Sequence, residues 1–370
     1  MTILKFLTTN LIFTRFYNHE RSRTPTNKRE YRNNKFVLVR VGWCGSWLKK
    51  GNKSIVSGLF LLFLLLTCWQ TAELAAQTPR RWPNFVLSPT SARPGEPFSV
   101  AFNELNSVLS AEMLRAVLVD SRGRQLTRAS FFRMPGEEHI TVAVMAVPST
   151  ALTGNAFVRI ETAYALIQEL PFVIENRNFY SETIQLDPVN TDLRTRPDPQ
   201  RTAESESLWA ILNRNGTEVF SSEPFVLPVD STRRTSYFGS RRVFQYSSGS
   251  SDTSIHAGVD FGVPTGTEVR SCAAGRVVLA RGRILTGNSV IIEHLPGIYS
   301  LYYHLNEIAV TEGSVVEAGT FLGYSGATGL ATGPHLHWEI RVSGENADPD
   351  AFLSRPLIDK NDIINKLANY

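Results

Sequence analysis

The sequence predicts a mainly β protein with an N-terminal β-sandwich-like domain, a helical linker and a C-terminal antiparallel β domain. Two series of short apolar runs separated by turn residues lead to this prediction, and a polar stretch with one helical segment lies between them. Glycine is dense in the second series, where helical signals are almost absent. This pattern favours a compact antiparallel sheet whose strand ends carry loops.

Charge is distributed unevenly along the 370 residues. Residues 1–50 contain 11 Lys or Arg and 2 Asp or Glu, a net charge of +9, and residues 51–76 are neutral overall. Because the whole chain carries +4, residues 77–370 carry −5. A mildly acidic body offers no electrostatic surface for DNA or RNA, so we exclude nucleic acid as a partner. With 42% hydrophobic residues, the chain is long enough for two apolar cores.

Residues 49–76 have the layout of an export signal. Lysines precede the apolar run Ile55–Trp69, and the small residues of Leu74-Ala75-Ala76 suit cleavage by a signal peptidase. The run is shorter than the roughly 20 apolar residues of a membrane span. Two alternatives stay open, namely an uncleaved membrane anchor and lipidation at Cys68. In each case we expect an exported protein of the periplasm or cell envelope.

Residues 1–48 form a leader of doubtful status, basic and without clear periodicity. We interpret it as the product of a start codon assigned too far upstream, and the alternative is a disordered extension before an internal anchor. Cys44 and Cys68 fall in the leader and signal, so the mature chain would keep only Cys272. This excludes an intrachain disulfide, and we interpret Cys272 as a packed residue because nothing near it resembles a base.

Five short apolar runs between residues 77 and 176 predict the strands of the N-terminal domain. They are Phe98–Phe102, Ala116–Val119, Ile140–Val144, Ala156–Ile160 and Pro171–Ile174. The domain contains one histidine, His139, for which we expect a place at the surface or at a strand start.

The polar linker covers residues 177–229. Within it, Gln200–Arg214 is expected to form a helix with Asp198 as N-cap, Pro199 in the first turn and Gly216 beyond the end.

The C-terminal domain is expected over residues 230–354, followed by a tail over 355–370. Its predicted strands are Val277–Leu279, Ser289–Ile292, Tyr299–Tyr303 and Leu336–Val342. Five of the seven histidines lie between residues 256 and 337, and four of these five occur in stretches rich in Gly, Thr and Pro. This clustering is the main functional signal of the chain.

The pair His335 and His337 is separated by one residue, Leu336. In a strand the side chains at i and i+2 point to the same face, so both imidazoles are expected to face one groove. His256 and Asp260 are spaced by four, and Gly258 permits a tight bend between them. Zinc prefers nitrogen and oxygen ligands, and a catalytic site keeps three protein ligands with one open position. His256, Asp260 and one histidine of the pair complete such a set.

His304 is a further candidate, since hydrolysis of an amide needs unligated imidazoles near the metal for proton transfer and for steadying the anionic intermediate. His294 ends an apolar run before a Pro-Gly turn, and we expect a structural role for it.

Several segments together resemble the lysostaphin/LytM-type zinc metalloendopeptidases over residues 230–352. They are Thr235–Arg241, His256-Ala-Gly-Val-Asp260, Gly287-Asn288 with the following strand to His294, Tyr302-Tyr-His304-Leu305 and Gly333-Pro-His335-Leu-His337-Trp-Glu339. The resemblance implies that His256, Asp260 and His337 bind one zinc ion and that His304 and His335 serve catalysis. It also implies peptidoglycan peptides as substrate and a zinc-bound water as nucleophile with a histidine general base.

Two other functions stay open. Some relatives of this fold have lost zinc ligands and act as wall-binding regulators that activate other peptidoglycan hydrolases, whereas all five residues are present here. A structural zinc site is the second alternative, but such sites are closed by four protein ligands and rarely rely on Asp. We expect a monomeric zinc metalloendopeptidase that acts on peptidoglycan, with a possible attachment to the membrane through its N-terminal apolar segment.

Overall fold

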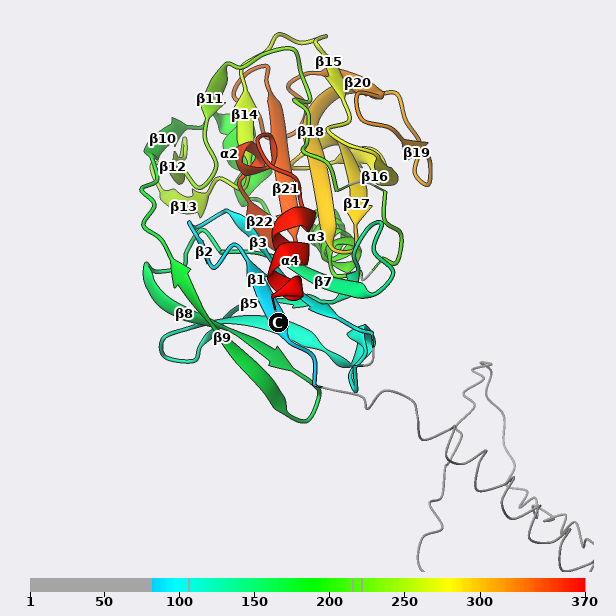
Figure 1. Ribbon diagram of the computed structural model, residues 1–370. Helices are drawn as coiled ribbons and strands as arrows, with labels where there is room; N and C mark the ends of the chain where they lie inside the picture. Colours follow the sequence, from blue (N-terminus) through cyan, green and yellow to red (C-terminus); the bar gives the residue numbers. More distant parts are fainter. Residues whose placement is uncertain (1–81, 106, 215, 221, 370) are drawn as a thin grey trace, which may run out of the picture. The chain divides into compact units, whose positions relative to one another are not determined.

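The computed structural model describes residues 82–369 except 106, 215 and 221 (Figure 1). The leader, the export segment, Cys44 and Cys68 lie outside the described residues. In the part of the chain that is described, no helix is both long and apolar enough to cross a membrane.

Two sheets build the N-terminal part. The first has the strand order β1 (Phe85–Ser88), β3 (Pro97–Asn103), β7 (Ile140–Ala146) and β6 (Phe132–Arg133). The second has the order β2 (Ser91–Ala92), β9 (Leu166–Ile174), β8 (Gly154–Glu161), β4 (Arg115–Asp120) and β5 (Gln125–Ser130), and the 3₁₀ turn η1 (Ala111–Met113) precedes β4. All five strands predicted for this part are present.

The two sheets share one core, as expected for a sandwich. The ring centroid of Phe98 on β3 lies 4.3 Å from that of Phe172 on β9. Leu118 on β4 and Val158 on β8 belong to the same buried cluster. His139 is exposed and immediately precedes β7, in agreement with the prediction.

Over its described residues, the expected linker contains one strand and two helices. They are β10 (Ser181–Gln185), α2 (Pro188–Thr195) and α3 (Pro199–Leu212). Asp198 caps α3 by accepting hydrogen bonds from the backbone N–H groups of Gln200 and Arg201, so the predicted N-cap is confirmed. β10 pairs in parallel with β12 (Arg241–Gln245), which pairs antiparallel with β13 (Ser251–Ile255). Part of the linker segment is therefore built into the C-terminal part.

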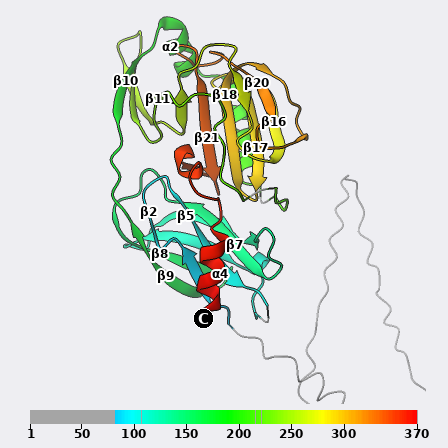
Figure 2. The same cartoon turned by 45° about the horizontal axis from the view of Figure 1, so that its top comes forward.

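A ten-stranded sheet forms the C-terminal part. Its main path is β11 (Arg234–Ser236), β14 (Val259–Phe261), β21 (Leu336–Val342), β18 (Ile298–Ile308), β17 (Gly287–Leu295), β16 (Gly275–Arg283) and β19 (Val315–Val316). β15 (Glu268–Arg270), β20 (Phe321–Ser325) and β22 (Glu345–Ala347) pair off this path. Figure 2 shows β21, β18, β17 and β16 side by side.

Each pairing within this sheet is antiparallel, which confirms the predicted mainly β fold with an antiparallel C-terminal sheet. Phe261, Tyr302 and Trp338 come from three neighbouring strands and are fully buried in its core. β18 and β21 are buried along most of their length, because a second buried cluster with Leu301 and Tyr303 packs with Leu212 of α3.

The expected C-terminal tail also has structure. The 3₁₀ turn η2 (Pro349–Phe352) precedes this tail, and the helix α4 (Lys360–Ala368) lies within it. Lys366 Nζ donates to the Leu87 carbonyl at 2.8 Å, and Ser88 Oγ donates to Asp362 at 2.6 Å, so α4 packs on β1. The domain limits at residues 176, 229 and 354 stay predictions.

Candidate metal centre

Strand register brings Asp260 and His337 together. β14 and β21 are antiparallel neighbours, and Asp260 lies directly opposite His337 in their ladder. Opposed residues in such a pair have Cβ atoms about 4.5–5.5 Å apart. Val259 and Phe261 flank Asp260 and are buried in the core, so the alternation along β14 turns the carboxylate to the other face.

His256 reaches the same place from the turn that precedes β14. A Cβ atom at position 258 would lie 2.1 Å from the carbonyl oxygen of Trp338 and would clash with it, so the turn requires glycine here. The close approach of this turn to β21 holds the His256 ring beside that of His337, with 4.8 Å between ring centroids.

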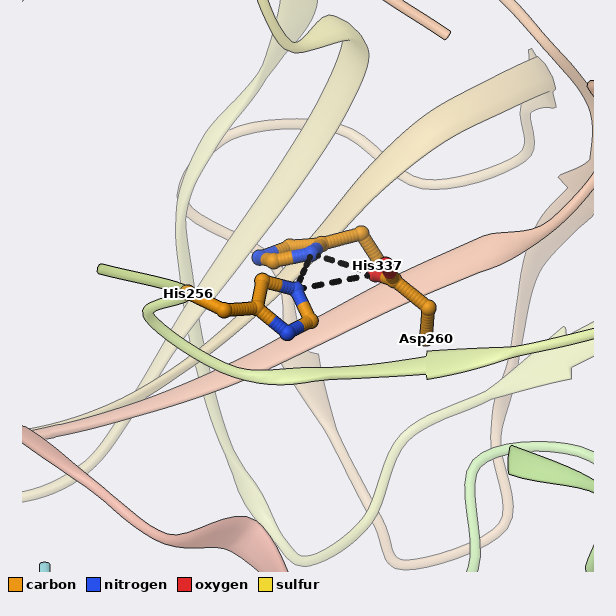
Figure 3. A group of neighbouring side chains, drawn as sticks. All are labelled: His256, Asp260 and His337. Atoms are coloured by element: carbon orange, nitrogen blue, oxygen red, sulfur yellow. Dashed lines mark hydrogen bonds and ion pairs between the residues drawn. The ribbon is translucent and has the colours of Figure 1, made fainter. Parts of the chain in front are cut away.

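Three donor atoms converge from these residues, as Figure 3 shows. His256 Nε2 lies 3.1 Å from Asp260 Oδ1 and 3.0 Å from His337 Nδ1, and Asp260 Oδ1 lies 2.7 Å from His337 Nδ1. Tetrahedral zinc with ligands at about 2.0–2.2 Å separates its ligand atoms by about 3.3–3.6 Å. The three distances between the donor atoms are shorter than that, and all three residues are buried. The set would therefore hold a small cation once the three atoms move slightly apart.

In both histidines of the triangle, the ring nitrogen that points away from the other donor atoms has a hydrogen-bond partner. His256 Nδ1 lies 2.9 Å from the carbonyl oxygen of Tyr237. A carbonyl only accepts, so this nitrogen donates and Nε2 keeps its lone pair for a metal. His337 Nε2 lies 3.0 Å from Glu339 Oε1, which leaves Nδ1 to face the other donor atoms. Carbonyl and carboxylate partners of this kind set the tautomer and orientation of metal-binding histidines.

Arg242 holds the third member, Asp260, through the oxygen that points away from the triangle. Its Nη2 donates to Asp260 Oδ2 at 2.7 Å, and its Nε donates to Glu182 Oε1 at 2.7 Å. Ser236 Oγ accepts from Arg242 at 2.8 Å and donates to Glu182 at 2.7 Å. Since Glu182 belongs to β10, the strand from the expected linker supports the metal-ligand set.

The charges of the centre are strongly coupled. Burial opposes ionisation of Asp260, but His256 and His337 hold the pKa of its carboxyl well below the usual value. Burial also lowers the pKa of His337, yet its hydrogen bonds with Asp260 and Glu339 raise that pKa to about 9. Glu339 is buried too, and Arg341 and His337 bring its pKa down to about 2. Without a metal, His337 therefore carries a proton on Nδ1 that a cation must displace.

His304 and His335 lie next to the triangle, with 4.7 Å between their ring centroids. His304 Nδ1 donates to the carbonyl of Thr328 at 2.7 Å, and His335 Nδ1 donates to the carbonyl of Gly333 at 2.8 Å. Each ring therefore keeps Nε2 for proton exchange. Burial, with the neighbouring imidazoles, lowers the pKa of His304 to about 3. Its backbone φ of 61° lies in the left-handed region, a strain that often marks functional residues.

All five side chains named from the sequence line one groove of about 280 Å³. His335 and His337 both face it, as their spacing predicts. One wall comes from Ile184 and Leu186 at β10 and from Arg194 of α2.

The remaining candidates lie away from this groove. His294 is fully buried, with Nδ1 2.8 Å from the Ala274 carbonyl and Nε2 2.7 Å from Ser300 Oγ. The structural role predicted for His294 is thus confirmed. Cys272 is fully buried as well, and His294 Nε2 lies 3.7 Å from its Sγ, so the expectation that no base lies near it is wrong. Burial still raises the pKa of the Cys272 thiol to about 12 and lowers that of His294 to about 4, which agrees with a packed rather than reactive residue.

Sequence reasoning missed Glu339, Arg242 and Glu182. Glu339 carried a usable signal, because residues 337 and 339 share a strand face by the period of two. Arg242 and Glu182 carried none, because Arg242 reaches Asp260 from another strand and Glu182 reaches Arg242 only through the parallel pairing of β10 with β12.

Residues 254–349 match the model of peptidase family M23. This stretch contains all five residues, and the C-terminal part of the chain is an M23 domain of the lysostaphin/LytM type, as the sequence motifs predict.

Known relatives share this stretch. The chain is 40% identical over 95 residues to the DD-carboxypeptidase/endopeptidase Mpg of Neisseria meningitidis serogroup B, covering 26% of this chain and 22% of that protein. It is 41% identical over 118 residues to the peptidoglycan DD-endopeptidase ShyA of Vibrio cholerae, covering 32% and 27%. The chain thus spans about a quarter of these curated relatives. A crystal structure of a peptidase M23 from Pseudomonas aeruginosa aligns with a TM-score of 0.49 and 25% identity over 71% of this chain and 94% of that chain.

Proposed function

We propose that this protein is a zinc-dependent endopeptidase that hydrolyses peptide cross-links or stem peptides of bacterial peptidoglycan. The observation that carries the proposal is the convergence of three buried donor atoms beside two further imidazoles in one groove. The M23 domain and its similarity to enzymes named DD-endopeptidases support this substrate class, and in particular bonds between D-amino acids.

His256, Asp260 and His337 would hold the metal, one ion per chain. When bound, zinc polarises the carbonyl of the scissile bond and lowers the pKa of water toward about 7. Three protein ligands are typical of a catalytic site, whereas structural sites have four. The donor set, two nitrogens and one oxygen, suits zinc.

His335 and His304 carry the proton transfers. As water adds to the carbonyl carbon, His335 accepts a proton at Nε2 and then delivers it to the amine nitrogen as the C–N bond breaks. Its side chain is 17% exposed, so it can meet both water and substrate. His304 has its Nδ1–H bound to the Thr328 carbonyl and a pKa lowered by burial, so its free Nε2 would accept a hydrogen bond from the attacking water and hold it in place.

The substrate also implies a location. Because peptidoglycan lies outside the cytoplasmic membrane, the function requires export, and we place the protein in the periplasm or cell envelope. A monomer suffices for this function, because every residue of the proposed site comes from one chain.

The test is the zinc content and activity of purified residues 77–370 beside His335→Ala. We expect about one zinc per chain in both proteins and release of new amino groups from peptidoglycan by the unsubstituted protein only. Zinc binding with intact peptidoglycan from several sources would favour the non-catalytic regulator instead.

A further inference from the structure

A second cavity, of about 490 Å³, continues from the groove of the metal centre. The two cavities share the lining residues Leu285, Thr286, Tyr303 and Glu339. Its other walls come from α3 and from the ends of β16 and β21. The two cavities are therefore neighbours, and a substrate held in the groove would lie beside the side chains that line the second one.

Three arginines line the cavity: Arg201, Arg283 and Arg341. Arg341 is paired with Glu339 at 2.9 Å, so its charge is already balanced. Among the residues that the structure describes, neither Arg201 nor Arg283 forms an ion pair with a carboxylate. Arg201 donates to two carbonyl oxygens of α2, which leaves Arg283 as the guanidinium best able to take a new anionic partner.

The half-buried guanidinium of Arg283 has hydrogen-bond partners that carry no charge, the Tyr303 hydroxyl among them. Nη1 donates to Thr286 Oγ1 at 3.1 Å, and Nη2 approaches the carbonyl oxygen of Glu204 at 3.4 Å. The Glu204 carboxylate also lines the cavity, but its oxygens accept from the Ile284 N–H at 2.9 Å and from Gln200 at 2.8 Å. The lining therefore holds three positive and two negative side chains, an excess of one positive charge.

Tyr303 links the two cavities. Its ring stacks on that of His337 with centroids 5.5 Å apart, and the Arg283 guanidinium carbon lies 6.0 Å from its centroid. An extended peptide advances about 3.3–3.6 Å per residue, so about three residues cover these two steps. A substrate cut at the metal centre can thus place a group up to about three residues from the scissile bond at Arg283.

We propose that this arginine-lined cavity binds a free carboxylate of the peptide substrate, with Arg283 as its main partner and Arg201 beside it. The proposal rests on the function proposed above. Guanidinium suits this task because its planar fork donates two parallel hydrogen bonds to a carboxylate. Arg283 would then be a specificity-determining residue that selects peptides with unamidated carboxyl groups.

The experiment compares two synthetic cross-linked peptides that differ only in having free or amidated carboxyl groups. We expect kcat/KM to be at least about tenfold higher for the free form, and Arg283→Gln to remove this preference while leaving the amidated peptide within about twofold. Arg283→Lys keeps the charge without the fork and should retain part of the preference. The matched control is Arg281→Gln on the same strand, whose side chain pairs with Glu312 and is 53% exposed.

Equal rates on both peptides in the unsubstituted protein would overturn the proposal, as would an equal loss on both peptides in Arg283→Gln, which indicates a structural role. If neither peptide is cleaved, the proposed function fails instead. Calorimetric binding then tests the cavity alone, since Arg283→Gln should weaken binding of the free peptide about tenfold and leave the amidated peptide unchanged. Unchanged binding of both peptides would overturn it.

Discussion

Glu339 Oε1 lies 3.0 Å from His337 Nε2 and thereby orients the opposite ring nitrogen toward Asp260 and His256. Both side chains are buried on β21, two residues apart, so strand geometry keeps the carboxylate behind the imidazole. The arrangement is that of a carboxylate and histidine pair prepared for a metal.

Removal of this carboxylate should weaken metal binding. We expect Glu339→Ala to lower zinc affinity by about 10–100-fold, because the tautomer and basicity of His337 are no longer set. Competition with a chromophoric chelator measures the affinity directly. The control is Glu307→Ala on β18, an exposed side chain, and an unaltered zinc affinity in Glu339→Ala would contradict the assigned role.

Arg242 is expected to act through Asp260. Loss of its 2.7 Å hydrogen bond to Asp260 Oδ2 in Arg242→Gln leaves that buried oxygen without its charged partner, so the carboxylate should lose its fixed orientation. We predict a fall of about tenfold or more in zinc affinity, with little change in the far-UV circular dichroism spectrum. Arg270→Gln, at an exposed ion pair elsewhere, should bind zinc as the unsubstituted protein does.

Substitutions should distinguish the metal ligands from the proton-transfer residues by their effect on zinc content. Asp260→Ala is expected to lose zinc and activity together, because it removes one of three donor atoms. His304→Ala should keep about one zinc per chain and lose turnover by about 100-fold or more. Metal analysis of both variants, with His139→Ala as an exposed control, checks this division, and a zinc-free His304→Ala would show that its role is misassigned.

His294 should make stability depend on pH. Burial lowers its pKa to about 4, against about 6.5 in an unfolded chain, so the unfolded state binds more protons between these values. The stability that folding gains from neutral, buried His294 is fully present above pH 6.5 and is lost as the pH falls to 4. Between pH 7 and pH 4, the free energy of unfolding should therefore drop by about 3 kcal/mol more than in His294→Gln. Chemical denaturation at several pH values measures this difference, and parallel curves for the two proteins would refute it.

The sequence by itself determined much of the site. Alternation by two places His335 and His337 on one face, and the spacing of His256 and Asp260 around Gly258 suits a tight turn. These relations depend on local backbone geometry, which a few neighbouring residues specify. The nine strands named from apolar runs were recoverable for a similar local reason, since short runs rich in β-branched and aromatic residues between turn residues mark a strand whether one face is buried, as in β8, or both, as in β7.

Only the tertiary structure decided how these pieces meet. The register of β14 and β21 places Asp260 opposite His337, and the parallel pairing of β10 with β12 brings Glu182 to Arg242. The second cavity likewise depends on α3 lying over the end of β16, where Arg283 is found. Such contacts join residues that are far apart in the chain, and their stability comes from the packing of whole surfaces rather than from any local pattern.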